Sequence, residues 1–363
     1  MDAAYKIWIQ ELKQRIYSAQ QKALHSVNEQ MILLYWDIGK EISEKQQIQS
    51  WGNKVVEQMA KDLKSELPGV HGFSRTNLFA MRKFFLFYKD YAAGNSGLEL
   101  PDFIESQSDV IVHQPGEQLT PNSILCKIPW RHHVSILGKC STIEEAFFYL
   151  SETIENGWSR NLLEMQIESG LMKRQGKLLN NFSNTLPKPQ SDLARETFKD
   201  PYKFDFLTLE ADVQELQLEK SLTENVTQFL LELGKGFAFV GRQYLLNVGT
   251  KERRIDLLFY HLKMRCYVVI DLKMSEFEPE FAGKMNYYLS AIDKQLKTDA
   301  DNPSIGIILC KSKNKIEVEY ALQDISKPMG VSEFSFNELP LTIQKNMPTL
   351  EEIEHEFGDM NEI

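Results

Sequence analysis

The chain has 363 residues, of which 42% are hydrophobic and 25% are charged, so it is long enough for two domains and its composition is not that of a disordered protein. Its net charge of −10 argues against a protein whose whole surface binds nucleic acid, although a local basic site is compatible with that charge. No run of 18 apolar residues is present and the N-terminus is charged, so we expect no membrane span, no signal peptide and a cytoplasmic location.

Most of the first half of the chain shows apolar residues at helical spacing. The break PGVHGF separates two of the expected helices, and Ser74 can cap the second one. The polar stretch 94–121 predicts a long loop. The helices expected in this half span residues 5–48, 55–67, 75–91, 129–137, 143–156 and 159–169.

The second half contains short segments rich in β-branched and aromatic residues. HLKM separates RRIDLLFYH from RCYVVIDL, a spacing that suits a hairpin. The order α-β-β-β-α-β-α-β predicts an α/β domain with a mixed sheet. Its expected helices span residues 213–233, 279–296 and 316–325, and its expected strands span 237–248, 253–261, 265–272, 305–310 and 331–336.

These patterns divide the chain into four parts. We expect a helical N-terminal domain at residues 1–185 and the α/β domain at residues 206–345. The stretch PKPQSD predicts a linker at residues 186–205. Residues 346–363 form an acidic C-terminal tail without Lys or Arg.

Two opposite charges stand at the end of an apolar strand, in YVVIDLKM. Asp271 and Lys273 are two residues apart, so their side chains leave the same face of the strand. A hairpin can bring Asp256, on the neighbouring strand, to the same edge. Two converging carboxylates repel, and their ionised forms are stabilised by a divalent cation such as Mg²⁺ or Mn²⁺. Lys273 could then orient a water or support charge on a phosphate.

By itself the pattern D…DxK is a weak signal. The alternative interpretation is a salt bridge at a strand end, which in an arbitrary protein is the more common reason for such a pattern. Here both acids lie beside buried apolar runs, and a buried acid needs a partner or a metal ion. The position therefore favours a functional site.

Stretches along almost the whole chain resemble the YhcG-like family of PD-(D/E)xK proteins. The N-terminal ones are LLYWDIGKEI, GFSRTNL, IPWRHHV and ENGWSRNLLEMQI, and the C-terminal ones are FLLELGKGFAFVGRQY, IDLLFYH, VVIDLK, FEPEFAGKMNYYL and NPSIGIILCKSK. The resemblance implies a restriction-endonuclease-like αβββαβ domain behind a helical, winged-helix-like N-terminal domain. It implies Asp256 as the first acid and Asp271-Leu272-Lys273 as the (D/E)xK element, with a metal ion held by Asp256, Asp271 and the Leu272 carbonyl.

The resemblance also implies a further acid on the upstream helix, as a metal ligand or as a residue that helps to place the metal. Glu219 is the first choice for this acid and Glu224 is the second. Gln243, on the first strand of the domain, is an accessory candidate that could face the same cleft. Its alternative role is that of a polar residue at the sheet edge.

Two residues depart from the pattern of the wider superfamily. Asp271 stands where Glu is common, and Lys284 stands where related nucleases often have the Gln of a Gln-x-x-x-Tyr motif, whose Tyr is matched by Tyr288. Lys284 could serve a phosphate as a point charge, or be an ordinary solvated lysine. The two departures are compatible with a domain that has lost cleavage activity.

The N-terminal half contains a pattern that resembles a helix-turn-helix unit, VVEQMAKDLKSEL followed by GFSRTNLFAMRKFFLFYKDY. Arg75, Arg82 and Lys89 recur seven residues apart and form a basic stripe opposite an apolar face, with Lys83 on the same helix. Such a stripe suits phosphate contacts or entry into the major groove of DNA. The alternative is an amphipathic helix with a solvated basic face.

The sequence thus predicts a metal-dependent DNA endonuclease with an N-terminal DNA-binding domain. Its partner would be duplex or branched DNA, and recombination, repair and mobile-element defence are all compatible roles. The alternative function is a catalytically inactive nuclease-fold module that binds DNA or protein. Either form could act as a homo-oligomer or as a subunit of a larger complex.

Overall fold

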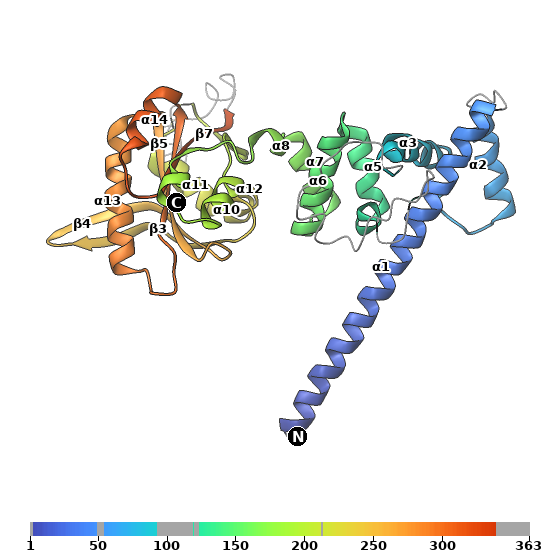
Figure 1. Cartoon of the computed structure of the whole chain (residues 1–363), viewed down its shortest axis with the longest axis horizontal. Coiled ribbons are helices and arrows are strands. Elements are labelled where there is room, and N and C mark those ends of the chain that lie inside the picture. The colour runs from blue at the N-terminus through green and yellow to red at the C-terminus, as the bar shows by residue number, and fades with distance from the viewer. Residues whose placement is uncertain (1–2, 49–53, 93–118, 120–122, 212, 339–363) are drawn as a thin grey trace, which may run out of the picture. The chain divides into compact units, whose positions relative to one another are not determined.

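The computed structural model describes residues 3–48, 54–92, 119, 123–211 and 213–338, and it divides into two compact units between Met172 and Lys173 (Figure 1). The first unit is helical and the second contains a mixed sheet with helices, which confirms the expected fold class. Most of the expected loop 94–121 and the whole expected tail lie outside the described residues. No helix in the described ranges is long and apolar enough to cross a membrane.

An aromatic core holds the helices of the first unit together. Trp36 packs edge-on against Phe84 and Phe85, with ring centroids 5.6 and 5.1 Å away. The backbones approach closely at Gly39, where a Cβ would collide with the carbonyl oxygen of Met81. The helices are α1 (Ala3–Ile48), α2 (Lys54–Glu66), α3 (Arg75–Ala92), η1 (Ile124–Lys127), α5 (Trp130–Lys139), α6 (Ile143–Asn156), α7 (Arg160–Glu168) and α8 (Leu171–Arg174), the last of which crosses the unit boundary.

The second unit is built on one mixed sheet (Figure 1). Its strands are β1 (Leu179–Asn180), β2 (Tyr202–Leu209), β3 (Phe237–Val248), β4 (Lys251–His261), β5 (Cys266–Glu276), β6 (Ile305–Ser312) and β7 (Met329–Glu338). The strand order is β1-β7-β6-β5-β4-β3, and β2 pairs with β7 off this path. Strands β3, β4 and β5 pair antiparallel, whereas β5, β6 and β7 pair parallel.

Helices cover both faces of this sheet. They are α9 (Phe182–Thr185), α10 (Gln190–Thr197), α11 (Glu215–Glu224), α12 (Val226–Leu233), α13 (Pro279–Gln295) and α14 (Lys315–Gln323). The expected helix 213–233 is interrupted at Asn225, which separates α11 from α12. Helices α11 and α12 pack into one hydrophobic cluster, and α13 and α14 pack into the cluster on the opposite face. Gly306 on β6 lets α13 lie close to the sheet, because a Cβ there would stand 2.5 Å from Sδ of Met285.

The segment expected as a linker, residues 186–205, is instead part of the folded second unit. It contains α10 and the start of β2, and Ala194, Phe198 and Tyr202 are buried in the core. The unit boundary lies earlier, after Met172. The Pro-rich, polar composition of this segment is typical of a linker. The contacts that fold it are made with residues distant in sequence, so they leave no local pattern.

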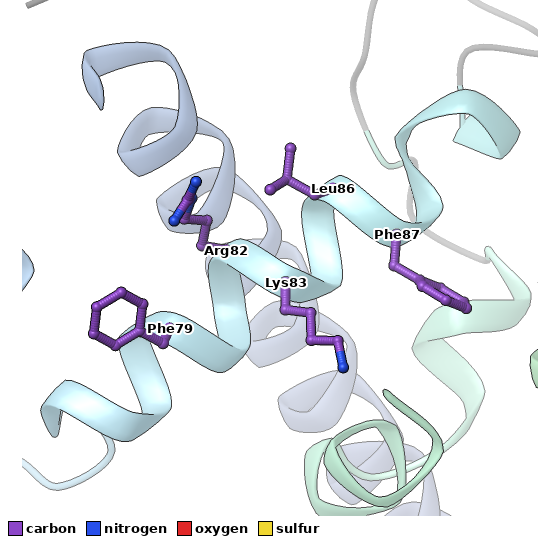
Figure 2. Close-up of a pocket in the computed structure, with 5 residues that line it drawn as sticks. All are labelled: Phe79, Arg82, Lys83, Leu86 and Phe87. Atoms are coloured by element: carbon purple, nitrogen blue, oxygen red, sulfur yellow. The ribbon is translucent and has the colours of Figure 1, made fainter. Parts of the chain in front are cut away.

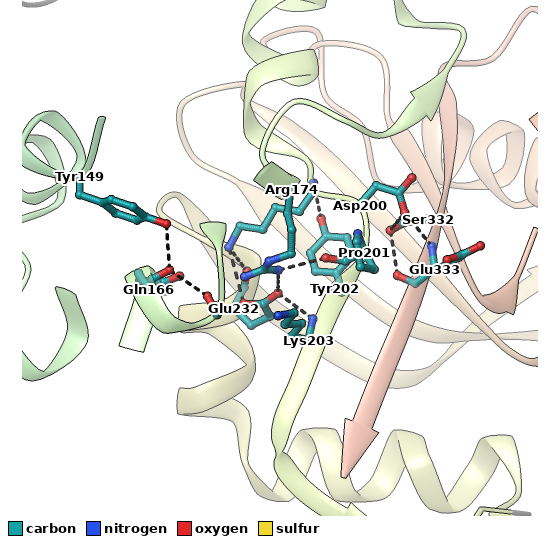
Figure 3. Close-up of polar contacts among 12 residues, drawn as sticks. Tyr149, Gln166, Arg174, Asp200, Pro201, Tyr202, Lys203, Glu232, Ser332 and Glu333 are labelled. Atoms are coloured by element: carbon teal, nitrogen blue, oxygen red, sulfur yellow. Dashed lines mark hydrogen bonds and ion pairs between the residues drawn. The ribbon is translucent and has the colours of Figure 1, made fainter. Parts of the chain in front are cut away.

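A buried group of charges ties this segment to α12 (Figure 3). Arg174 Nη1 donates hydrogen bonds to Glu232 Oε1 over 2.5 Å and to the Pro201 carbonyl over 3.0 Å. Lys199 Nζ lies 3.8 Å from Glu232 Oε2, and all three charged residues are at most 7% exposed. Charges buried this deeply are tolerated only when they are paired. Glu232 therefore anchors the segment.

Replacing Glu232 by Gln should destabilise the second unit, because two buried cations would lose their anionic partner. We expect the free energy of unfolding to fall by about 3 kcal/mol, measured by urea denaturation. The matched control is Glu224→Gln, in an exposed pair with Lys220, which should change that free energy by less than about 0.5 kcal/mol. Equal effects of the two substitutions would contradict the anchoring role.

Candidate active site

Two aspartates face each other across the β4–β5 pair. Leu257 pairs with Ile270 in this antiparallel ladder, so the next positions along the two strands, Asp256 and Asp271, are opposite each other. Asp256 Oδ2 accepts a hydrogen bond of 2.9 Å from the backbone N–H of Leu272. Both aspartates therefore lie at the same end of the β4–β5 pair, close enough for the charge of Asp271 to act on Asp256.

The regular alternation of β4 breaks at Asp256. Leu257 belongs to the cluster with α11 and α12, whereas Ile255 belongs to the cluster with α13, although residues two apart on a regular strand share a face. The register places Gln243 opposite Asp256, and Gln243 has a left-handed backbone with φ of 47°. Non-glycine residues in this conformation are uncommon and concentrate at functional sites. This local distortion sets the position of the first acid.

Two ammonium groups converge on Asp271. Lys273 Nζ lies 3.0 Å from Asp271 Oδ2, and Lys284 Nζ, from α13, lies 3.0 Å from Asp271 Oδ1. Lys273 Nζ also donates to the Leu272 carbonyl over 2.5 Å. The side chain of Asp271 is 2% exposed and that of Lys284 is 42% exposed, so one cation of the pair remains accessible from solvent.

The charges of the site perturb the protonation of its acids. Burial, and then repulsion from Asp271, raise the pKa of Asp256 to about 7, against the opposing effects of the Leu272 N–H and of Lys273 and Lys284. Burial disfavours the ammonium form of Lys284, but the attraction and hydrogen bond of Asp271 outweigh it and raise the pKa of Lys284. The site thus lacks enough positive charge to keep both aspartates ionised at mildly acidic pH.

Helix α11 supplies an acid that the sequence reasoning missed. Glu215 Oε2 lies 3.2 Å from Lys273 Nζ, and its Oε1 accepts from the Met274 N–H over 3.2 Å. Glu219, one helical turn later, accepts a hydrogen bond from Gln243 and lies 3.3 Å from Arg242 Nε. The four-residue spacing of the two glutamates, which puts them on one helix face, was the available signal.

The other sequence candidates take different positions. Glu224 is exposed at the end of α11 and pairs with Lys220, 3.8 Å away. The Tyr288 hydroxyl donates to the Arg254 carbonyl over 2.9 Å, and its ring lies under Lys284 Nζ at 5.3 Å. Tyr288 therefore braces β4 against α13 and positions Lys284.

The donors at this site fit a hard divalent cation. Within residues 3–48, 54–92, 119, 123–211 and 213–338, no group of three or more His, Cys, Asp or Glu side chains could hold a metal ion. Two carboxylates and the Leu272 carbonyl nevertheless converge, and Asp271 Oδ2 is buried without a hydrogen bond despite its proximity to Lys273. Mg²⁺ is commonly bound by one or two carboxylates and keeps several waters.

The basic residues expected to bind DNA lie on α3 and differ in their surroundings. Arg75 Nε pairs with Glu57 of α2 at 2.9 Å, and Lys83 Nζ donates to the carbonyl of Leu137. Arg82 Nε is buried and has no hydrogen-bond partner among the described residues. Lys89 is half-buried in the last turn of the helix. The stripe is therefore partly engaged in contacts within the first unit.

A groove follows one side of α3 (Figure 2). It has a volume of about 450 Å³ and is lined by Phe79, Arg82, Lys83, Leu86 and Phe87. Three apolar and two cationic side chains share this surface, so the exposed face of α3 is less uniformly basic than the sequence spacing indicated.

Comparisons with known proteins match both halves of the chain. Residues 195–348 match the family model of the YhcG PDDEXK nuclease domain, and residues 11–174 match the DUF1016 N-terminal domain. The chain is 31% identical over 328 residues to "Putative nuclease YhcG" of Escherichia coli (strain K12), a match that covers 87% of this chain and 86% of the relative.

Two solved structures also show similarity. One is a repair endonuclease from Pyrococcus abyssi, 15% identical with a TM-score of 0.24, where the match covers 36% of this chain and 49% of that chain. The other is a complex of EndoMS with double-stranded DNA, 18% identical with a TM-score of 0.25, where the match covers 38% of this chain and 48% of that chain.

Replacing Asp256 by Asn should stabilise the metal-free protein at pH 8. The pKa of Asp256 is about 7 in the folded state and about 3.9 in an unfolded chain. The folded state therefore binds this proton more tightly, and the free energy of unfolding falls as pH rises from about 4 to about 7. Removing the ionisable group should recover up to about 4 kcal/mol at pH 8 and almost nothing at pH 4, measured by urea denaturation in EDTA.

The matched control is Asp299→Asn, an exposed aspartate with no resolved contact to the site, which should leave stability unchanged at both pH values. A loss of stability in Asp256→Asn at pH 8 would contradict the prediction, because it would show that the charged carboxylate stabilises the fold.

Proposed function

Because the chain belongs to the YhcG family of PDDEXK nucleases, we propose that it is a metal-dependent endonuclease that hydrolyses phosphodiester bonds in DNA. The observation that carries this proposal is the opposed pair Asp256 and Asp271, with Lys273 Nζ 3.0 Å from the second acid. Hydrolysis of a phosphodiester needs an activated water and positive charge near the phosphate, and these groups can supply both.

In this mechanism Asp256, Asp271 and the Leu272 carbonyl would hold Mg²⁺ or Mn²⁺, which would supply an activated water and a positive charge for the phosphate. Lys273 holds the nucleophilic water, since its ammonium group already lies among the Asp271 carboxylate, the Leu272 carbonyl and Glu215. Glu219 acts as the upstream acid that helps to place the ion. Lys284 binds a non-bridging phosphate oxygen, because it is the more exposed of the two cations.

The first unit is proposed to bind the DNA. Support comes from α3, where Arg82 lies beside a groove and Lys89 follows it on the same helical stripe. Arg75 and Lys83 contribute less in this proposal, because each already contacts another helix of the unit.

A second function is supported by the contacts of Asp271. Two ammonium groups already lie within 3.0 Å of this carboxylate, so its charge is balanced without a metal ion. A protein of this kind could bind DNA through the same cations without cleaving it. The cleavage experiment below separates the two functions.

Asp271→Asn and Lys273→Met should each reduce Mg²⁺- or Mn²⁺-dependent DNA cleavage by about 100-fold or more, measured on duplex, single-stranded and branched oligonucleotides. The matched controls, Asp299→Asn and Lys315→Ala, change exposed charges elsewhere in the second unit and should retain full activity. Cleavage that survives both site substitutions would place the activity elsewhere. A wild-type protein that binds these DNAs and cleaves none of them would establish the second function.

Arg82→Ala combined with Lys89→Ala should weaken DNA binding and reduce the slope of log K against log salt concentration by about 2, because each lost phosphate contact removes about 0.9. Fluorescence anisotropy at several salt concentrations measures both quantities. The control pair Lys61→Ala and Lys64→Ala removes two exposed charges from α2. An unchanged slope in the α3 variant would show that its basic residues only solvate the helix.

A further inference from the structure

The β3–β4 hairpin extends past the strand that supports it. Strand β5 pairs with β4 only over Leu257–His261, whereas residues 251–255 of β4 pair with β3 alone (Figure 1). Gly249, with φ of 62°, stands at the turn. An isolated two-stranded ribbon is only marginally stable in water, so this part of the hairpin needs support from another element.

Helix α13 provides that support. Leu246 and Ile255 are buried in the same cluster as Leu289 of α13. Gln295 Nε2 donates to the Asn247 carbonyl over 2.9 Å. Together with the bond from Tyr288 to β4, these contacts hold the hairpin at a fixed position beside the helix that carries Lys284.

The hairpin and α13 enclose a groove of about 450 Å³, lined by Lys251, Arg253, Lys284, Tyr287 and Tyr288. The lining contains three cations, two aromatic rings and no carboxylate, although the chain has 51 acidic residues against 41 Lys and Arg. Among the described residues, no carboxylate forms an ion pair with Lys251 or Arg253. The charges of Lys251 and Arg253 are thus opposite to the net charge of the whole chain and are available to a ligand.

The groove leads directly into the carboxylate site. Lys284 belongs to both, since it lines the groove and its Nζ lies 3.0 Å from Asp271 Oδ1. A polyanion that occupies the groove would therefore present one of its charged groups at the aspartate pair. A regular chain of phosphates has this property, whereas a single small anion would need only one of the three cations.

We propose that this groove holds the sugar–phosphate backbone of the cleaved DNA strand next to the scissile bond, with Lys251 and Arg253 on the flanking phosphates. The proposal rests on the proposed nuclease function and names the surface that positions its substrate. Tyr287 is 40% exposed and offers a ring on which an unpaired base can stack, which favours a single-stranded or frayed segment at this position.

The test measures DNA binding by the full chain, with Ca²⁺ in place of Mg²⁺. Binding is measured by fluorescence anisotropy over a range of salt concentrations. Lys251→Ala combined with Arg253→Ala should weaken binding about 10-fold. It should also lower the slope of log K against log salt concentration by about 1.8, because each of the two lost phosphate contacts removes about 0.9. Arg253→Lys should keep the slope. The control pair Lys220→Ala and Lys315→Ala, two exposed lysines of the same unit, should change neither quantity.

Tyr287→Ala should weaken binding of single-stranded DNA about 10-fold, within the range measured for base–aromatic stacking, and Tyr287→Phe should restore it. An unchanged affinity and salt slope in the Lys251/Arg253 variant, or a wild-type protein that binds no DNA, would overturn the groove proposal. Because binding is measured without turnover, a protein that uses the groove but never cleaves contradicts the proposed function alone. Cleavage that depends on Asp271 with no effect of the groove residues contradicts the groove alone.

Discussion

The candidate site depends on two carboxylates placed next to each other where the β4–β5 ladder ends. The β4–β5 ladder ends at Leu257 and Ile270, so Asp256 and Asp271 are the next residues along the two strands, and the Leu272 N–H holds the Asp256 carboxylate. Burial, and then repulsion from Asp271, raise the pKa of Asp256. Three groups compensate for this repulsion: two ammonium groups approach Asp271, and one backbone N–H reaches Asp256. Because two neighbouring buried carboxylates cost stability, we interpret the pair as a binding site for a cation.

The surrounding fold determines which cations reach the pair. Lys273 is carried by β5 itself and is held by Glu215 of α11, on one side of the site. Lys284 comes from α13, whose distance from the sheet is set where Gly306 accommodates Met285. The two helices pack into different hydrophobic clusters, on opposite faces of the sheet. The site therefore needs both layers of the second unit to be complete.

The sequence predicted the parts of this site that follow from local periodicity. Asp271 and Lys273 share a face because they are two residues apart on a strand, and the HLKM turn brings Asp256 opposite. The sequence could not predict features that arise from tertiary packing: the left-handed backbone of Gln243 and the pairing of β2 with β7. Likewise, Lys199 lies in the segment expected as a linker, and its contact with Glu232, 33 positions further along the chain, helps to hold that segment in the core.

The two departures from the superfamily pattern meet in space. Asp271 stands where a longer Glu is common, and Lys284 stands where Gln is common; in the structure their charged groups are 3.0 Å apart. A shorter carboxylate leaves room at the strand end, and a lysine four carbons long can reach into that room from α13. The lysine also adds the positive charge that a neutral amide would not supply beside two acids. The Lys284 ammonium group therefore adds one positive charge beside the two aspartates and connects the site to the basic groove beside the hairpin.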